Sequence, residues 1–408
     1  MNDKLKEFID RNWNKCIREN RFDNGTLIGL PYPYSVPNTG GFDEMYYWDT
    51  YFTNVGLIAW GRAIQAKFNV DNMLYMVNKF GFMLNGNRTH YLYNTQPPFL
   101  SEMVKDVYAY YNDIAWLSGA YTVLKKEYDF WMNNRISSIG LNIYYGNEMP
   151  EDVIDKYSKM YCERTGYPYS EEDKKRIAHH CMASAESGWD MNPRFDDDAY
   201  NYAPVDLNSL MYGFEINMAF FASELGEDSA EDWNKKAENR KKLMMQYMTS
   251  EDGILLDYNY KTQKLCTVFS VASLYPMFVN MMDENYAKII AENFYRLKGE
   301  FGVFTCEKNE TNRTYQWDYP NGWPCMQYIT IKSFDNYGYK EIAKEVAKDY
   351  IGVIENNFER TGNLWEKYNM LDGSTNTKQE FIAVDDLPEM MGWTAGSYIY
   401  AKRYLGEL

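Results

Sequence analysis

The chain has 408 residues, of which 45% are hydrophobic and 17% aromatic, so it can bury a substantial core in one or two domains. Acidic residues outnumber basic ones by 58 to 42, and the formal net charge of −16 makes nucleic acids and anionic membranes poor partners. An acidic surface also argues mildly against a highly anionic substrate.

The cysteines are scattered without a CxxC pair, at Cys16, Cys162, Cys181, Cys266, Cys306 and Cys325. This distribution is typical of reduced thiols. Residues 1–20 are charged and helix-like and contain no apolar signal core. No run approaches the roughly 18 uninterrupted apolar residues of a membrane span. We therefore expect a soluble cytoplasmic protein, while its oligomeric state stays open.

Helical periodicity dominates the chain from end to end. The first two pairs of helices are expected at 49–83, with a break near Asn69, and at 101–134. Further helices are expected at 206–227, 229–248, 285–299, 337–362 and 394–408, and strand-like alternation is confined to 253–262 and 264–269. No linker or internal repeat divides the sequence, which favours a closed toroid of helical hairpins in a single domain, residues 1–408.

Long loops rich in aromatic residues, Gly, Pro and Asn separate these helices, at 31–49, 84–100, 184–206, 312–325 and 361–393. Loops of this length in a compact domain are usually functional. They carry carboxylates, amides and tryptophans, but no nucleophile elbow, phosphate-binding loop or dinucleotide fingerprint. The three histidines leave little room for a histidine-rich metal site.

Carboxylate pairs beside tryptophan surfaces are what glycoside hydrolysis requires, because one acid protonates the leaving oxygen and one carboxylate activates water or attacks carbon. The stretch "SAESGWDMNPRF" places Asp190 directly after Trp189. A single aspartate is more often a helix cap or a surface group than a catalytic acid. The residue types alone therefore do not decide whether Asp190 is a catalytic acid or a helix cap or surface group.

The segments "GGFDEMYYWDTYF" and "QWDYPNGWP" resemble the two signatures of trehalase-type glycosidases. "NGNR", "QPP", "ESGWD", "PVDLN" and "WEKYN" also resemble family segments and follow the family order between Val36 and Gly396. The resemblance, to glycoside hydrolase families 37 and 63, implies an all-α (α/α)6 barrel. It also implies an inverting α-glycosidase that acts on a small α-glucoside without a metal or an organic cofactor.

By the same resemblance Asp190 is the general acid and Glu366 the general base, about 6.5–9.5 Å apart across the sugar ring. Burial beside Trp189 and the negative charge of Glu366 are expected to keep Asp190 protonated. The candidate substrate-binding residues are Phe42, Trp48, Asp49, Asn85, Arg88, Gln96, Trp189, Arg194, Gln316, Trp317, Asn321 and Glu380.

Three arginines that hold the leaving-group sugar in trehalases are missing from this chain. "PNTGGF" lacks the first, Asn94 stands in the place of the second, and "EMPEDV" around Met149 replaces the third. A rebuilt leaving-group subsite is therefore expected, for a neutral α-glucoside or, alternatively, for glucosylglycerate or mannosylglycerate. A glycerate carboxylate would need a cation, for which Arg88, Arg194 and Lys367 are the candidates.

Two further alternatives come from other functional classes. One is an inactive carbohydrate-binding homologue, although both expected catalytic carboxylates are present. The other is a phosphorylase or lyase on a similar toroid, although the loops offer little basic charge for phosphate.

Overall fold

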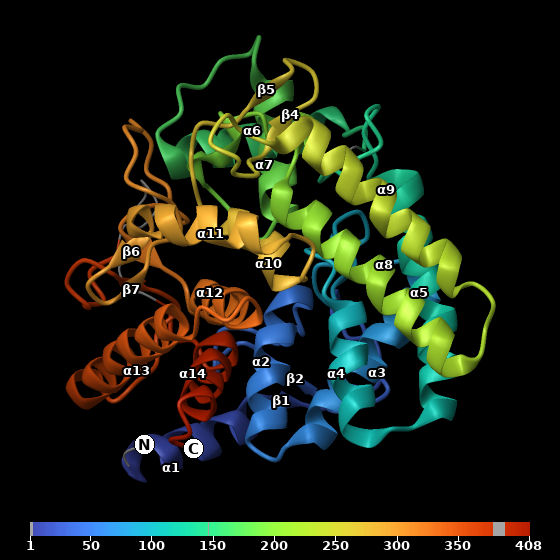
Figure 1. Cartoon of the computed structure of the whole chain (residues 1–408), viewed down its shortest axis with the longest axis vertical. Coiled ribbons are helices and arrows are strands. Elements are labelled where there is room, and N and C mark those ends of the chain that lie inside the picture. The colour runs from blue at the N-terminus through green and yellow to red at the C-terminus, as the bar shows by residue number, and fades with distance from the viewer. Residues whose placement is uncertain (1–2, 146, 378–387) are drawn as a thin grey trace.

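The computed structural model describes residues 3–145, 147–377 and 388–408, and it confirms the all-α (α/α)6 barrel (Figure 1). An inner ring runs through α2 (Tyr47–Ala59), α4 (Leu100–Tyr111), α8 (Val205–Leu225), α10 (Tyr275–Phe278), α12 (Pro324–Asn336) and α14 (Gly392–Tyr404). Each of these helices packs on the next, and α14 closes the ring on α2. The short α10 is extended at its start by the 3₁₀ helix η4 (Val271–Leu274).

The outer layer consists of α1 (Asp3–Lys15), α3 (Ala63–Phe80), α5 (Ile114–Asn134), α9 (Ala230–Met248), α11 (Glu284–Asn293) and α13 (Lys340–Thr361). Burial separates the two layers. The inner helix α8 is buried along almost its whole length, whereas its outer neighbour α9 buries one stripe, Trp233, Ala237, Arg240, Met244 and Met248. A stripe at this helical spacing is typical of a helix with one face on the core and one in water.

A further hairpin, α6 (Glu151–Thr165) and α7 (Lys174–Glu186), lies outside this alternation, and its two helices pack on each other. Strands are two residues long: β1 (Ile17–Arg18), β2 (Tyr34–Ser35), β3 (Tyr202–Ala203), β4 (Tyr258–Asn259), β5 (Lys264–Leu265), β6 (Lys298–Gly299), β7 (Gly302–Val303), β8 (Asn321–Gly322) and β9 (Tyr368–Asn369). They pair antiparallel as β1–β2, β3–β4–β5, β6–β7 and β8–β9. The remaining 3₁₀ helices are η1 (Thr89–Tyr91), η2 (Pro193–Phe195), η3 (Ala199–Asn201) and η5 (Phe294–Arg296).

The predicted helix break near Asn69 is wrong. The first helix pair is divided at Gly61, whose φ of +77° suits glycine and ends α2. Asn69 lies inside α3, fully buried, and its amide donates to Asn54 Oδ1 at 2.8 Å and to Ser35 Oγ at 3.1 Å. An asparagine that would favour a turn in isolation is therefore used here for tertiary hydrogen bonds.

The ring closes where α2 and α14 cross at two glycines. A Cβ atom on Gly56 would lie 2.4 Å from the Cα of Gly396, and one on Gly396 would lie 2.0 Å from the backbone oxygen of Phe52. Any larger residue would force the two backbones apart. This contact holds the first turn of α2 next to the first turn of α14, where the site described below lies.

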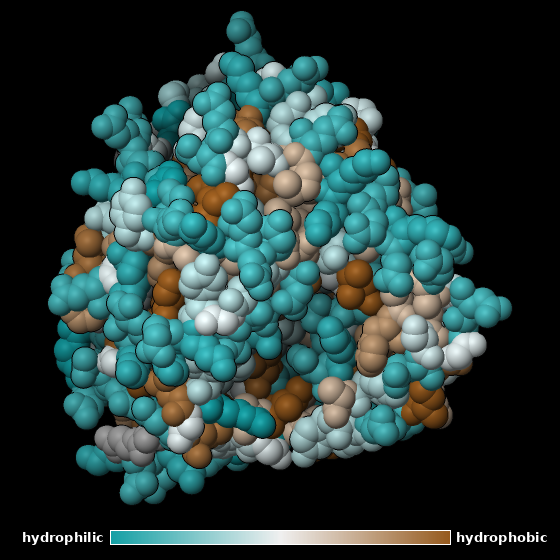
Figure 2. Space-filling view, in the orientation of Figure 1, coloured by the Kyte–Doolittle hydropathy of each residue, from teal (hydrophilic) through white to brown (hydrophobic). Residues whose placement is uncertain are grey.

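The molecular face in Figure 2 is hydrophilic over most of its area, with apolar residues scattered among polar ones. Among the described residues, no helix combines the length and the apolar character that a membrane crossing requires.

Candidate active site

A pocket of about 310 Å³ opens at the end of the barrel where inner helices begin. Trp48 and Asp49 lie in the first turn of α2, Trp323 directly precedes α12, and Trp393 lies in the first turn of α14. The predicted residues that line the pocket are Phe42, Trp48, Asp49, Asn85, Gln96, Asp190, Gln316, Trp317 and Glu366. Segments from five separate loops thus meet in one place.

Tryptophans dominate one side of the pocket. Trp317 stacks on Trp323 with ring centroids 3.7 Å apart, and Trp393 meets both rings edge-on, at 6.2 and 5.6 Å. Trp48 lies 5.6 Å from Trp317, and Trp189 stacks against Trp317 from within the core at 5.7 Å. Such a surface suits the apolar face of a sugar ring.

The turn that carries Asp190 depends on Gly188. Its φ is +74°, and a Cβ atom there would lie 2.6 Å from the Trp48 ring, so only glycine fits. The Ser187 hydroxyl accepts a hydrogen bond from the Trp189 backbone N–H at 3.1 Å. The cap of the following helix η2 is Asn192, which accepts from the Arg194 backbone N–H at 2.9 Å. Asp190 itself lies on the pocket wall.

Glu366 lies next to a buried lysine. The ammonium group of Lys367 lies 2.6 Å from Glu366 Oε2, and the Lys367 side chain is only 1% exposed. The backbone holds Glu366 as well, because its N–H donates to the Pro388 carbonyl at 3.0 Å and its carbonyl accepts from Trp393 Nε1 at 3.3 Å. The Glu366 side chain keeps 17% exposure, towards the pocket.

Asp49 is a third carboxyl group in the same pocket. Burial raises its pKa to about 7, and the negative charges of Glu366 and Asp190 act in the same direction, while a bond from its own backbone N–H opposes them. Asp49 is therefore partly protonated near neutral pH.

The amide side of the pocket is built from the loop before α4. The side-chain oxygen of Gln96 accepts from the Trp48 backbone N–H at 3.2 Å, and the Asn85 backbone N–H donates to the Asn94 carbonyl at 2.9 Å. Asn94, which stands in the place of a family arginine, lines the pocket itself. This loop therefore contributes polar groups directly above the start of α2.

Arg194 was expected to bind substrate, but in the structure its guanidinium group binds two buried aspartates instead. It is fully buried, does not line the pocket, and forms paired hydrogen bonds of 2.8–3.0 Å with Asp206 and Asp257. Its guanidinium also lies 4.3 Å from the centroid of the Trp189 ring. The loop sequence could not reveal these partners, because Asp206 lies 12 residues further along the chain and Asp257 lies 63 residues further, and only the fold brings both to Arg194.

The other predicted residues away from the pocket are Arg88, Trp189 and Asn321. Arg88 pairs with Glu44 and donates to the Thr26 hydroxyl at 2.8 Å. Asn321 is buried in β8 and donates to the Gln316 backbone carbonyl at 2.9 Å, so it shapes the loop. Trp189 backs the aromatic wall, and Glu380 lies outside the described residues.

Several lining residues were not predicted. Tyr157, Met160 and Arg164 come from one face of α6, at a spacing of three and then four residues. The helical spacing predicts that these side chains share one face of α6, but it cannot tell whether that face lines a pocket or packs into a core. Trp323 directly precedes the inner helix α12 and Trp393 lies in the first turn of α14, and only the ring places them together.

No group of three or more His, Cys, Asp or Glu side chains suited to a metal ion occurs in residues 3–145, 147–377 and 388–408.

Comparison with known proteins gives consistent matches. The family model described as Trehalase matches residues 1–406. Periplasmic trehalases of Xanthomonas axonopodis pv. citri and Xanthomonas campestris pv. campestris are 29% and 30% identical, over 96% of this chain and 72% of each relative. The neutral trehalase of Saccharomyces cerevisiae superposes with a TM-score of 0.79 at 26% identity, covering 91% of this chain and 74% of that one. A family 63 mannosylglycerate hydrolase from Thermus thermophilus shares the fold, with a TM-score of 0.66, 14% identity and 98% coverage of both chains.

The expected cytoplasmic location is contradicted by the Xanthomonas relatives, which are named periplasmic trehalases. The expectation rested in part on unpaired cysteines. All six are free, and burial raises the pKa of each thiol, so they are poorly reactive. Unreactive, unpaired thiols of this kind do not report the redox state of a compartment.

Proposed function

Since the chain belongs to the trehalase family and is a glycoside hydrolase of the trehalase type, we propose that it hydrolyses a small α-glucoside with inversion, using Asp190 as acid and Glu366 as base. One observation carries this proposal: both carboxyl groups line the same tryptophan-walled pocket, although 176 positions separate them in the sequence. The pocket volume of about 310 Å³ is at the small end of ligand sites, as a small sugar requires.

The proposed reaction uses the two carboxyl groups on opposite sides of the sugar. Asp190 donates its proton to the glycosidic oxygen as the bond to the anomeric carbon breaks. Glu366 accepts a proton from a water molecule that attacks the same carbon from the other face, and this produces the inverted sugar. The Lys367 ammonium at 2.6 Å stabilises the negative charge of Glu366 before the reaction.

Asp49 and the amides of Asn85 and Gln96 would bind the hydroxyls of the cleaved glucose. Carboxylates and amides can accept hydrogen bonds from sugar hydroxyls while the tryptophans hold the ring face. The raised pKa of Asp49, to about 7, makes its ionised fraction and hence this binding sensitive to pH near neutrality.

The leaving group would lie against Tyr91, Asn94 and α6. The three cations considered for a glycerate carboxylate are each engaged elsewhere: Arg88 with Glu44, Arg194 with two aspartates, and Lys367 with Glu366. This favours a neutral leaving group, such as a second sugar. A further cation, Arg164, lines the pocket from α6, and it too interacts with another part of the chain. Its position on this wall is the observation in favour of the alternative, an anionic leaving group such as glycerate.

Proton NMR of the purified protein tests both points. From trehalose we expect equal amounts of β-glucose, from the attacked ring, and α-glucose, from the leaving group. From another neutral α-glucoside such as kojibiose we expect the cleaved glucose to appear as the β-anomer, and added phosphate should leave the rate and products unchanged. Preferential cleavage of glucosylglycerate would select the anionic leaving group. Initial release of α-glucose alone from trehalose would contradict inversion, and sugar binding without any turnover would favour the inactive homologue.

A further inference from the structure

A second cavity, of about 620 Å³, lies at the opposite end of the barrel from the candidate active site. Its walls are the later turns of the inner helices, such as Val55 and Ile58 of α2, Lys332 and Asn336 of α12, and Tyr400 of α14. The same helices present their first turns to the active site. The two cavities therefore share one ring of helices but use opposite ends of it.

A layer of aromatic side chains separates the two cavities. Trp48 of the active site contacts Phe52 edge-on at 5.7 Å, and Phe52 contacts Tyr51 at 5.1 Å. Tyr51 stacks on Phe99 at 4.4 Å and its hydroxyl lies 2.9 Å from that of Tyr328. Tyr51 and Tyr328 line the second cavity, so its inner end is an aromatic surface with two hydroxyls.

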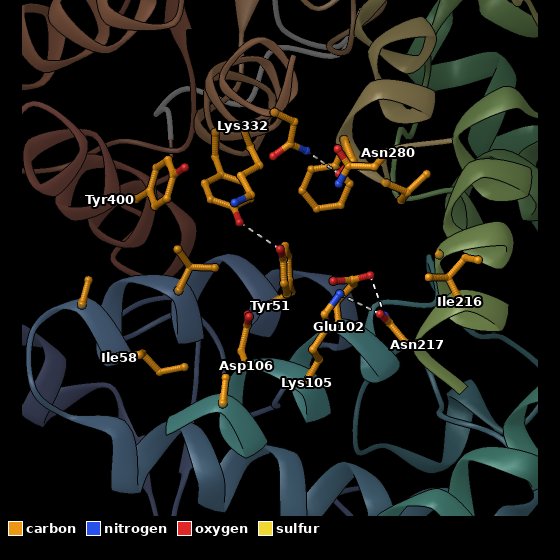
Figure 3. A pocket seen from close by; sticks show the side chains of 18 of the residues that line it. Tyr51, Ile58, Glu102, Lys105, Asp106, Ile216, Asn217, Asn280, Lys332 and Tyr400 are labelled. Atoms are coloured by element: carbon orange, nitrogen blue, oxygen red, sulfur yellow. Dashed lines mark hydrogen bonds between the residues drawn. The ribbon is translucent and has the colours of Figure 1, made fainter. Parts of the chain in front are cut away.

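One wall of the cavity carries a fixed polar cluster. Asn217 of α8 donates to Glu102 Oε1 at 2.6 Å and accepts from Lys105 Nζ at 3.0 Å (Figure 3). These bonds hold α4 to α8 and orient both charged side chains. They leave other lone pairs of Glu102 and other protons of Lys105 available to the cavity.

The side chains of Asp106 and Lys332 are not held by hydrogen bonds of this kind. Figure 3 shows them pointing into the cavity from opposite sides, from α4 and α12. Neither side chain makes a hydrogen bond or an ion pair with any residue in the described part of the chain. Burial raises the pKa of Asp106 to about 7, the charge of Glu102 adds to this, and Lys105 and Lys332 oppose it. At neutral pH this carboxyl can therefore either donate or accept.

The arrangement of these groups indicates the class of ligand. Both acidic and basic side chains line the cavity: Glu102, Lys105 and Asp106 come from α4, Lys332 from α12 and Arg403 from α14. A simple anion would meet two carboxyl groups, and a simple cation would meet three basic side chains. A hydroxyl both donates and accepts, so a ligand rich in hydroxyls can bind to both kinds of side chain. The tyrosine faces suit the C–H side of such a ligand.

We propose that this cavity is a second binding site, for a neutral polyhydroxylated molecule of monosaccharide or disaccharide size. Asp106 and Lys332 bind its hydroxyls from opposite sides while Tyr51 and Tyr328 form the inner wall. The volume lies within the range of small-molecule sites.

Equilibrium dialysis with labelled glucose tests the site. We expect two glucose molecules per chain at saturation in the unaltered protein. The double variant Asp106→Leu/Lys332→Met should bind one, or bind the second about tenfold to a hundredfold more weakly, because hydrogen bonds to charged groups are lost. Ala109→Trp, which fills the cavity from an exposed position without removing a polar group, should give the same loss.

The matched control is Asp232→Asn/Lys235→Met, an exposed pair on α9 that should change nothing. A single glucose per chain that survives both cavity variants would overturn the proposal. A single glucose that both variants abolish would support this site and count against the active-site assignment instead. Phosphate or glycine that binds in an Asp106-dependent manner and excludes glucose would overturn the choice of ligand.

Discussion

Asp190 and Glu366 are held at the pocket wall by different parts of the fold. Glu366 has the buried ammonium of Lys367 at 2.6 Å, and Asp190 follows the fully buried Trp189 in the turn that Gly188 allows. A neighbouring cation favours the ionised form that a general base must have at the start of the reaction, and apolar surroundings favour the protonated form that a general acid must have.

The variants Asp190→Asn and Glu366→Gln test these roles. Each keeps the size of the side chain but removes its ability to transfer a proton, so we expect kcat to fall by at least about 10³-fold, the upper range for acid–base catalysis. Steady-state rates on the substrate identified by NMR measure this. The control is Glu310→Gln in an exposed loop. Most of the activity remaining in either active-site variant would contradict the assignment.

The pKa of Asp49 predicts how KM depends on pH. Its raised pKa, about 7, means that the carboxylate form increases between pH 6 and 8, and this is the form that accepts hydrogen bonds from two sugar hydroxyls. We expect KM to fall by up to about tenfold over that range. Asp49→Asn should remove this change and leave a KM that is flat with pH. A KM profile with the same inflection in the variant would assign the titration to another group.

At the scale of elements, buried ion pairs tie the loops of the site to the barrel. Glu186 at the end of α7 is fully buried and pairs with Arg135 at the end of α5, with an N–O distance of 2.9 Å. Glu186 also accepts from the backbone N–H groups of Thr95 and Tyr145, at 2.9 and 2.5 Å. One carboxylate thus positions the residue next to Gln96 and fixes the α6–α7 hairpin relative to α5.

Arg135→Met should therefore be strongly destabilising, because it leaves the Glu186 charge buried and unpaired, at a cost of about 3–5 kcal/mol. Chemical denaturation at pH 7 measures the free energy of unfolding. The control is Lys125→Met, which breaks an exposed pair with Glu227 and should cost less than about 1 kcal/mol. Similar losses in the two variants would mean that Glu186 is compensated in another way.

The sequence predicts elements well where one physical signal decides them. Most helices of the barrel, the SGWD turn and the pocket position of Glu366 follow from periodicity, a glycine and a motif, whereas α6, α7 and the ring helix α12 were not predicted. The break placed at Asn69 fails because hydrogen bonds to Asn54 and Ser35 override the turn preference of asparagine. Arg194 fails as a binding residue for a related reason: its partners Asp206 and Asp257 become neighbours only after folding.

At the scale of the whole molecule, one closed ring of helices positions both cavities, and the glycine crossing of α2 and α14 closes it. Helices of the ring supply residues to both ends, so we propose that residues 1–408 form one domain. The ends differ in chemistry: one carries tryptophans and three carboxyl groups, and the other carries tyrosines with both acidic and basic side chains.

Buried carboxyl groups give the whole molecule a pH-dependent stability. Burial raises the pKa of Glu127 to about 8, although a bond donated by the Tyr47 hydroxyl at 2.6 Å opposes this, and the pKa of Asp49 and of Asp106 is about 7. In the unfolded chain these groups lose their protons near pH 4. Between about pH 4 and 8 the folded state binds more protons, so the free energy of unfolding falls as pH rises.

Glu127→Gln isolates one of these groups. Glutamine keeps an oxygen that accepts from Tyr47, and it cannot ionise. We expect the variant to match the unaltered protein at pH 5 and to be more stable by about 3–4 kcal/mol at pH 8, since each pKa unit corresponds to about 1.4 kcal/mol. Denaturation at both pH values measures this, with the exposed Glu251→Gln as control. The hydrogen bond between Glu127 and Tyr47 joins α5 to the first residue of the ring helix α2. If the free energies of unfolding of the variant and the unaltered protein change in parallel from pH 5 to 8, this junction holds an ionised carboxylate instead.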